Sequence, residues 1–484
     1  MPPKVKGPQE SVSAVIILAA GQGRRMKSDL PKVLHEIAGQ PMIFQVLDSV
    51  REALPSATVC IVVGHGRELV EAAIRSNPAY SGLDLNFVHQ AEQRGTGHAA
   101  RCAMDSPWGE RVARAKLQVL VLPGDLPLIS ADLVRETAAP LGRASVLRIL
   151  STVLEDPSGY GRIVRRGKSG AVLRIVEERD ASIREKGIRE VGTSIYSFQG
   201  GFLKSGLHRL SDKNAQREFY LTDLVSQASG AKRGIDVLIW AEPQDLRGVN
   251  DLWELSQAGR LLNQRIVRAW ARGGVKFTDP ESCWVDSRVR FEGTAQVLPN
   301  VLLQGATTVA EGAKIGPHAV LKNMSVGAAA VIKAGTVAED SSIGARAQVG
   351  PYAHLRPGSE VGEDCKVGNF VELKKAKLGR KTSVSHLSYL GDAEVGARVN
   401  IGCGFITCNY DGRTKSMTVI EDDVFMGSDC QAVAPVRVGR GAYVASGSTI
   451  TDDVEPGALA VARSRQVTKP GYAKKYAKQN ASQG

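Results

Sequence analysis

The stretch AVIILAAGQGRRMKSDLPK, residues 14–32, combines an apolar run, two glycines and a group of cations. The apolar run is typical of a strand buried on both faces. Gly21 and Gly23 permit backbone conformations that other residues resist, so main-chain N–H groups can face an anion. Arg25 and Lys32 add positive charge. The stretch predicts a first strand followed by either a basic surface turn or a phosphate-binding loop.

Strand-like and helix-like segments alternate after this stretch. Residues 57–64 and 117–125 are apolar runs with strand character, whereas residues 41–54 and 66–76 have helical spacing. This alternation predicts a parallel sheet with helices on both faces, an α/β doubly wound (Rossmann-like) domain. Ligands of such sheets bind beyond the carboxyl ends of the strands, where both the opening loop and Asp125 are expected.

Aliphatic residues recur every six positions in the second half of the chain. The longest unbroken series is Ile343, Val349, Leu355, Val361, Val367 and Leu373. A period of six fits neither a helix nor a simple strand, but it fits a parallel β-helix of hexapeptide repeats, with one aliphatic side chain pointing inward per short strand. Three sides predict coils of about 18 residues and about ten coils between residues 285 and 463.

Composition limits the possible partners. The 484 residues carry a formal net charge of +12, spread along the chain without a dense basic block or a recognisable nucleic-acid motif. This pattern favours phosphorylated small molecules over nucleic acid. The seven cysteines are scattered, which predicts free thiols in a reducing compartment and no cysteine metal site. No apolar run approaches the ~20 residues of a membrane span, so we expect a cytoplasmic protein without membrane insertion.

These patterns divide the chain into five predicted parts. They are a disordered N-terminus (1–10), an α/β domain (11–250), a linker helix (251–274), a β-helix domain (275–463) and a basic C-terminal tail (464–484).

The first half resembles the nucleoside-diphosphate-sugar pyrophosphorylases, which join a nucleoside triphosphate to a sugar-1-phosphate. The matching segments are LAAGQGRRM with LPK (18–32), QAEQRGTGHA (90–99), PGDLPL (123–128), GYGRI (159–163), IVEERDA (175–181), NAQREFYLTD (214–223) and GVN (248–250). The resemblance implies that Arg25 and Lys32 offset phosphate charge during catalysis, and that Asp125 and Asn250 bind Mg²⁺. It also implies a nucleotide site at Leu18, Ala20, Gly21, Gly23, Lys32, Gln90, Gly95 and Thr96, and a sugar site at Gly161, Glu177 and Gly192.

The second half resembles the acetyltransferase part of the bacterial bifunctional UDP-N-acetylglucosamine pyrophosphorylase/glucosamine-1-phosphate N-acetyltransferases. The matching segments are LRPG (355–358), VGNFVELKKAKLG (367–379), HLSYLGDAEVG (386–396), TCNYDG (407–412), VFMGSD (424–429) and LAVAR (459–463). This family implies a left-handed β-helix, a homotrimer with sites between its rods, and two reactions. Glucosamine-1-phosphate is acetylated by acetyl-CoA, and N-acetylglucosamine-1-phosphate then receives UMP from UTP.

The same resemblance implies roles for residues of the β-helix. His386 would be the general base that takes a proton from the glucosamine amine, a role that suits histidine near neutral pH. Arg356 and Lys374 would bind the sugar phosphate, and Tyr389 and Asn400 the sugar. The residues implied for acetyl-CoA are Asn409, Tyr410, Ser428, Ser446 and Arg463, with Lys469 toward its phosphates.

Two positions depart from the family pattern. Gly192, in VGTSIY (191–196), stands where the family usually has a sugar-contacting asparagine, and Ser446 replaces an alanine. Gly192 predicts a weaker sugar site, a water in place of the amide, or relaxed specificity. Two other functions remain open at this point: a sugar-1-phosphate nucleotidyltransferase whose β-helix serves only assembly or regulation, and a binding or scaffold protein.

Overall fold

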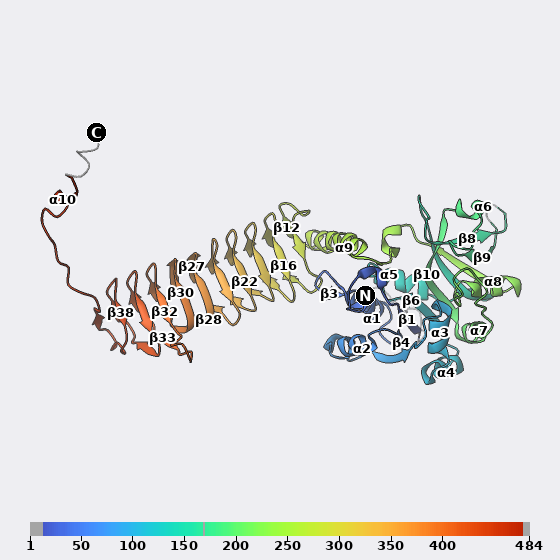
Figure 1. Cartoon of the computed structure of the whole chain (residues 1–484), viewed down its shortest axis with the longest axis horizontal. Helices are drawn as coiled ribbons and strands as arrows, with labels where there is room; N and C mark the ends of the chain where they lie inside the picture. Colours follow the sequence, from blue (N-terminus) through green and yellow to red (C-terminus); the bar gives the residue numbers. More distant parts are fainter. Residues whose placement is uncertain (1–12, 168–169, 478–484) are drawn as a thin grey trace, which may run out of the picture. The chain divides into compact units, whose positions relative to one another are not determined.

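The computed structural model describes residues 13–167 and 170–477. It divides into two compact units, Met1–Leu262 and Asn263–Gly484, each of which is described by itself (Figure 1). The N-terminal segment 1–10, expected to be disordered, lies outside the described residues. In the part of the chain that the structure describes, no helix is long and apolar enough to cross a membrane.

Unit 1 is built on a nine-stranded sheet with helices on its faces. Its strands are β1 (Ala14–Ala19), β4 (Thr58–Val63), β5 (Asp84–His89), β6 (Gln118–Pro123), β7 (Ser145–Val153), β8 (Gly161–Arg165), β9 (Val172–Val176), β10 (Glu190–Gln199) and β11 (Gly234–Ile239). Its helices are α1 (Met42–Ala53), α2 (Arg67–Arg75), α3 (Thr96–Met104), α4 (Pro107–Arg114), α5 (Ala131–Ala138), α6 (Ile183–Lys186), α7 (Gly200–Leu207) and α8 (Asp223–Gly230). The short strands β2 (Glu36–Ile37) and β3 (Gln40–Pro41) pair separately.

Strand β1 lies near the centre of this sheet, in the order β11-β7-β10-β6-β1-β4-β5. It is parallel to β4 and β6, as the sequence predicts. Its residues alternate between two cores, with Val15 and Ile17 on one face and Ala14 and Ile16 on the other. The sheet is mixed rather than wholly parallel, because β10 runs antiparallel to both β6 and β7. The loops after β1 and β6 therefore meet at one edge, beside the centre of the sheet.

Helix α9 (Leu252–Arg272) occupies most of residues 251–274, where the sequence predicts a linker helix. The boundary between the two units falls inside it. In unit 1, Ala258 joins a small core with Met42 and Val249. In unit 2, Val267 joins the core of the β-helix and Trp270 packs against it.

Unit 2 is a parallel β-helix whose faces form two long sheets (Figure 1). The 11-stranded sheet contains β12 (Val275–Phe277), β15 (Ala295–Val297), β18 (Lys314–Ile315), β21 (Val331–Ile332), β24 (Gln348–Val349), β27 (Lys366–Asn369), β29 (Ser383–His386), β31 (Asn400–Ile401), β34 (Phe425–Met426), β37 (Tyr443–Val444) and β39 (Leu459–Ala460). The 17-stranded sheet contains β13 (Trp284–Val285), β14 (Arg290–Glu292), β16 (Leu302–Gln304), β17 (Thr308–Ala310), β19 (Val320–Lys322), β20 (Ser325–Val326), β22 (Val337–Glu339), β23 (Ser342–Ile343), β25 (His354–Arg356), β26 (Glu360–Val361), β28 (Glu372–Leu378), β30 (Tyr389–Val395), β32 (Ile406–Cys408), β33 (Thr418–Ile420), β35 (Gln431–Val433), β36 (Val436–Val438) and β38 (Thr449–Ile450). A short helix, α10 (Lys474–Ala477), lies within the C-terminal tail.

The predicted coil of 18 residues is only partly right. Leu355 pairs with Leu373, 18 residues further on, but Leu373 pairs with Leu390, only 17 residues further on. Sides of five residues explain why the six-residue series breaks in the sequence. One coil is much longer, since Ile401 pairs with Met426, and the extra residues form a loop at 409–417.

Candidate functional site

The loop after β1 uses its two glycines differently. Gly23 has a φ of 60°, and a Cβ there would lie 2.8 Å from Cβ of Lys32, so glycine is required for the fold of the loop. Gly21 does not need a left-handed backbone, contrary to the expectation, and a Cβ there would meet no atom within 4 Å. The space over Gly21 is open, while Arg25, in the 3₁₀ turn Arg24–Met26, is exposed.

Lys32 connects the loop to the two residues predicted to bind metal. Its ammonium donates to Oδ2 of Asp125 at 2.5 Å and to Oδ1 of Asn250 at 3.0 Å. Asp125 follows β6, and its carbonyl oxygen accepts from the N–H of Val249. The three side chains, which we call the opening-loop site, thus bring two oxygens to one cation. Lys32 and Asp125 are mostly shielded, with 11% and 27% of their side chains exposed.

The main chain of this edge is held by neighbouring segments. The carbonyl oxygen of Leu18 accepts from the N–H of Gly124 at 2.8 Å. The carbonyl oxygen of Ala20 accepts from Nε2 of Gln93, a side chain that the sequence did not single out, at 2.5 Å. These bonds fix the two residues on which the predicted nucleotide loop begins.

The predicted base-reading segment lies at the start of α3. Gln90 is buried, and its Nε2 lies 3.2 Å from the carbonyl oxygen of Gly95 and 3.1 Å from Nδ1 of His98. Gly95 has a φ of 95°, and a Cβ there would lie 2.8 Å from the carbonyl oxygen of Phe219, so no other residue fits. The hydroxyl of Thr96 accepts from the N–H of Leu221 at 3.3 Å. The amide of Gln90 therefore uses its hydrogens within the protein and leaves its oxygen as the group for a ligand.

The three predicted sugar-site residues come together on β8, β9 and β10. Gly161 and Gly192 face each other across the antiparallel pair of β8 and β10. Oε2 of Glu177, just after β9, lies 3.5 Å from the position of a Cβ on Gly161. Burial raises the pKa of Glu177, while the hydrogen bond from the Thr222 hydroxyl opposes this shift.

His386 ends β29, on the surface of the β-helix. Its Nδ1 lies 2.8 Å from Oδ1 of Asn369, the residue beside it on β27. Because an amide oxygen only accepts, this contact favours the tautomer with hydrogen on Nδ1 and leaves a lone pair on Nε2. The exposed ring is therefore oriented as a base.

Asp392 joins residues predicted for two different substrates. Its Oδ2 accepts from Lys374 at 2.9 Å and from Nδ2 of Asn409 at 2.5 Å. Burial acts to raise the pKa of Asp392, but the hydrogen bonds from Lys374 and Asn409 outweigh it, so the pKa lies below its usual range. Arg356 lies beside Lys374 on the preceding coil and pairs with Glu372 at 3.0 Å. We call Asn369, His386, Lys374, Asp392 and Asn409 the coil cluster.

The sequence reasoning missed Asn369, Asp392 and Lys415. Lys415, in the inserted loop, lies beside Lys374, whose charge lowers the pKa of Lys415. Two neighbouring ammonium groups suit an anion. The signal for Asn369 and Asp392 was available, because each lies one coil from a residue that was predicted.

The remaining predicted residues surround this cluster or follow it along the coils. Tyr389 lies over Gly391, where a Cβ would come 2.3 Å from the phenol oxygen, and Asn400 is exposed on β31. Exposed Tyr410 donates its hydroxyl to the carbonyl oxygen of Gly412. The Ser446 hydroxyl accepts from the N–H of Ser428 at 3.1 Å, a bond that an alanine could not make. Arg463 and Lys469 are exposed, and within the described residues no hydrogen bond or ion pair joins these later residues to the coil cluster.

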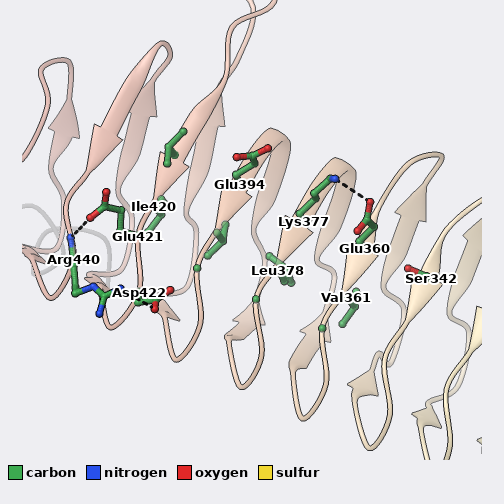
Figure 2. A pocket seen from close by; sticks show the side chains of 15 residues that line it. Ser342, Glu360, Val361, Lys377, Leu378, Glu394, Ile420, Glu421, Asp422 and Arg440 are labelled. Atoms are coloured by element: carbon green, nitrogen blue, oxygen red, sulfur yellow. Dashed lines mark hydrogen bonds and ion pairs between the residues drawn. The ribbon is translucent and has the colours of Figure 1, made fainter.

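A shallow groove of about 700 Å³ lies on another part of the β-helix (Figure 2). Its charged side chains are largely paired, as in Lys377 with Glu360 at 3.2 Å and Arg440 with Asp422 at 3.3 Å. None of the predicted site residues lines it. We therefore place the candidate chemistry at the opening-loop site and the coil cluster, and not in this groove.

Comparisons with known proteins agree with both halves. The MobA-like NTP transferase domain family matches residues 15–160, and the bacterial transferase hexapeptide family (six repeats) matches residues 340–375. The bifunctional protein GlmU of Geotalea uraniireducens is 43% identical over 95% of this chain and 98% of its own length. The proteins of the same name from Pelobacter propionicus (45% identical, 95% and 97% covered) and Corynebacterium aurimucosum (42%, 96% and 93%) are similar. The chain therefore belongs to the family of bifunctional GlmU proteins.

Proposed function

We propose that each activity of this bifunctional enzyme belongs to one unit. Unit 1 transfers uridylyl from UTP to N-acetylglucosamine-1-phosphate, and unit 2 transfers acetyl from acetyl-CoA to glucosamine-1-phosphate. The observation that carries this proposal is the meeting of Lys32, Asp125 and Asn250 in a domain that matches NTP transferases. Acetylation comes first, because its product is the acceptor of the second reaction.

The opening-loop site fits a Mg²⁺ ion. A carboxylate and an amide oxygen are ligands that Mg²⁺ accepts, and the ion keeps several waters, so two protein ligands suffice. The ammonium of Lys32 already occupies the point where these oxygens converge. A bound Mg²⁺ would offset charge on the phosphate oxygens. Lys32 would then turn from Asp125 and Asn250 to a phosphate of UTP.

In uridylyl transfer, an oxygen of the sugar phosphate attacks the α-phosphorus of UTP and pyrophosphate leaves. This reaction depends mainly on positioning and on cations near the phosphate oxygens. Arg25 and Lys32 hold the phosphates, and the loop N–H groups around Gly21 approach them closely. Oε1 of Gln90 accepts from the uracil N3–H, because its amide hydrogens face inward.

In acetyl transfer, Nε2 of His386 takes a proton from the amine of glucosamine-1-phosphate. The amine then attacks the thioester carbonyl, and the CoA thiolate leaves. Asn369 holds the imidazole in the required tautomer. Arg356, Lys374 and Lys415 bind the sugar phosphate.

We further propose that the acetyltransferase site is completed in a homotrimer. His386 lies exposed on the surface, whereas Ser446 and Arg463 lie on later coils. A neighbouring chain would bring these acetyl-CoA residues to the base and cover it from water.

Pyrophosphate release from magnesium-UTP tests the proposal. The acceptors are N-acetylglucosamine-1-phosphate, glucosamine-1-phosphate and glucose-1-phosphate. We expect a clear preference for the acetylated sugar. Equal use of all three, or a preference for glucose-1-phosphate, would contradict the sugar assignment.

A further inference from the structure

Two facing glycines open the sugar site of unit 1. Neither Gly161 nor Gly192 has the left-handed backbone that would require glycine. A Cβ on Gly161 would lie 2.8 Å from Cγ2 of Ile175, and a Cβ on Gly192 would lie 3.2 Å from Cδ1 of the same side chain. The glycines therefore provide space on the sheet, and the movable side chain of Ile175 borders that space.

A buried hydroxyl lies next to this space. Tyr196 is 1% exposed, and among the described residues its hydroxyl has no hydrogen-bond partner. The phenol oxygen lies 3.9 Å from the position of a Cβ on Gly192. Burial, together with the nearby charge of Glu177, raises the pKa of Tyr196, so the group stays a neutral O–H donor.

An unpartnered buried hydroxyl costs stability, and a phenylalanine of the same shape would avoid that cost. The hydroxyl needs a partner at some stage of the enzyme's work. The sugar site requires a polar contact beside residue 192, since the side chain expected there is absent. A tyrosine O–H can supply this contact from four residues further along β10.

We propose that Tyr196 binds the acetamido group of the sugar phosphate and determines specificity for it. The Tyr196 hydroxyl donates to the acetamido carbonyl oxygen, which enters the space over Gly192 as Ile175 rotates. The acetamido methyl packs against Ile175. This inference rests on the proposed uridylyl transfer, because it concerns the acceptor of that reaction.

Tyr196→Phe tests the inference in the full chain. We expect the KM for N-acetylglucosamine-1-phosphate to rise about 3–10-fold, the range that follows from the net contribution of one hydrogen bond. The KM values for glucose-1-phosphate and UTP should stay unchanged, and the Tm of the free protein should rise. Gly192→Asn in the Tyr196→Phe background should restore part of the discrimination, because it returns an amide to the site.

Tyr80→Phe is the matched control. Tyr80 is equally buried, but its hydroxyl donates to the carbonyl oxygen of Phe44 at 3.2 Å, so the variant should lower the Tm and leave every KM unchanged. An unchanged KM for the acetylated sugar in Tyr196→Phe, or an equal rise for both sugars, would overturn the inference. If the wild-type protein uses neither sugar phosphate, the proposed function itself fails, which is a different result.

Discussion

The opening-loop site and the coil cluster assemble similar residue types by different means. In the opening-loop site, Lys32 is 93 residues from Asp125 and 218 residues from Asn250. In the coil cluster, hydrogen-bonded partners are only 17 or 18 residues apart. A sheet of distant strands collects residues at one shielded edge, whereas a β-helix repeats one surface position at every coil. The first site is thus enclosed by its own unit, while the base of the second lies exposed and needs another surface to cover it.

The strongest way to break this comparison is to remove the base of the coil cluster. His386→Ala should lower acetyl transfer about 10²–10⁴-fold, the usual contribution of a general base, without changing uridylyl transfer. Thiol release from acetyl-CoA and pyrophosphate release measure the two activities. His208→Ala, at another exposed histidine, is the control. If the wild-type protein shows no acetyl transfer, the β-helix serves assembly or regulation only.

Asp125→Ala attacks the other side of the comparison. Loss of a charged group that holds the reacting phosphates should lower uridylyl transfer about 10²–10³-fold and leave acetyl transfer intact. Excess EDTA should have the same selective effect on the wild type. Asp132→Ala, at a carboxylate that is 77% exposed, should change neither activity. Equal losses in both activities would show that the sites are not separate.

Lys32→Ala tests whether the ammonium stands in the place of the metal. With the competing charge removed, we expect the free protein to bind Mn²⁺ about tenfold more tightly, although uridylyl transfer falls. Calorimetric titration without nucleotide measures this affinity. An unchanged or weaker affinity would place the metal away from Asp125 and Asn250.

Asn369→Ala sharpens the account of the coil cluster. Without the acceptor at Nδ1, the imidazole loses its fixed tautomer, and kcat for acetyl transfer should fall about tenfold. The acidic limb of the pH profile should also shift, while the KM for acetyl-CoA stays the same. Asn369→Asp keeps an acceptor and should restore most of kcat. A loss that Asp does not rescue would indicate a structural role.

The smallest expected effect concerns backbone strain in unit 1. Ser194 has a φ of 61°, a conformation that glycine adopts without strain. Ser194→Gly should raise the free energy of unfolding by about 0.5–1 kcal/mol. Ser205→Gly, in helix α7, should lower it. Denaturant titration of both variants measures the difference, and a destabilised Ser194→Gly would contradict the strain.

Much of the fold could be predicted, because local patterns encode it. The apolar run that became β1 and the six-residue series of the β-helix both reflect burial of alternate or periodic side chains. The antiparallel insertion of β10 could not be predicted, since strand order depends on contacts far apart in the sequence. The 17-residue coils were missed because a shorter side keeps the inward residue but breaks the count.

The candidate sites followed the same rule. Asp125 and Asn250 were predicted as a pair from the family resemblance, but the ammonium of Lys32 between them depends on side-chain geometry. Asn369 and Asp392 could have been found by counting one coil from His386 and Asn409. The unpartnered hydroxyl of Tyr196 has no sequence signal, since a tyrosine in a strand usually indicates only a packed core.

The β-helix also determines where unit 2 loses its structure first. Each coil contacts only its neighbours, so unfolding spreads stepwise along the rod, as in other one-dimensional arrays. At the N-terminal end, Trp270 of α9 packs on Phe291 with ring centroids 5.2 Å apart and closes the first coils. At the opposite end, Leu459 in the last strand is 69% exposed. Fraying should therefore begin at the coils that carry Ser446 and Arg463, and amide hydrogens there should exchange before those around His386.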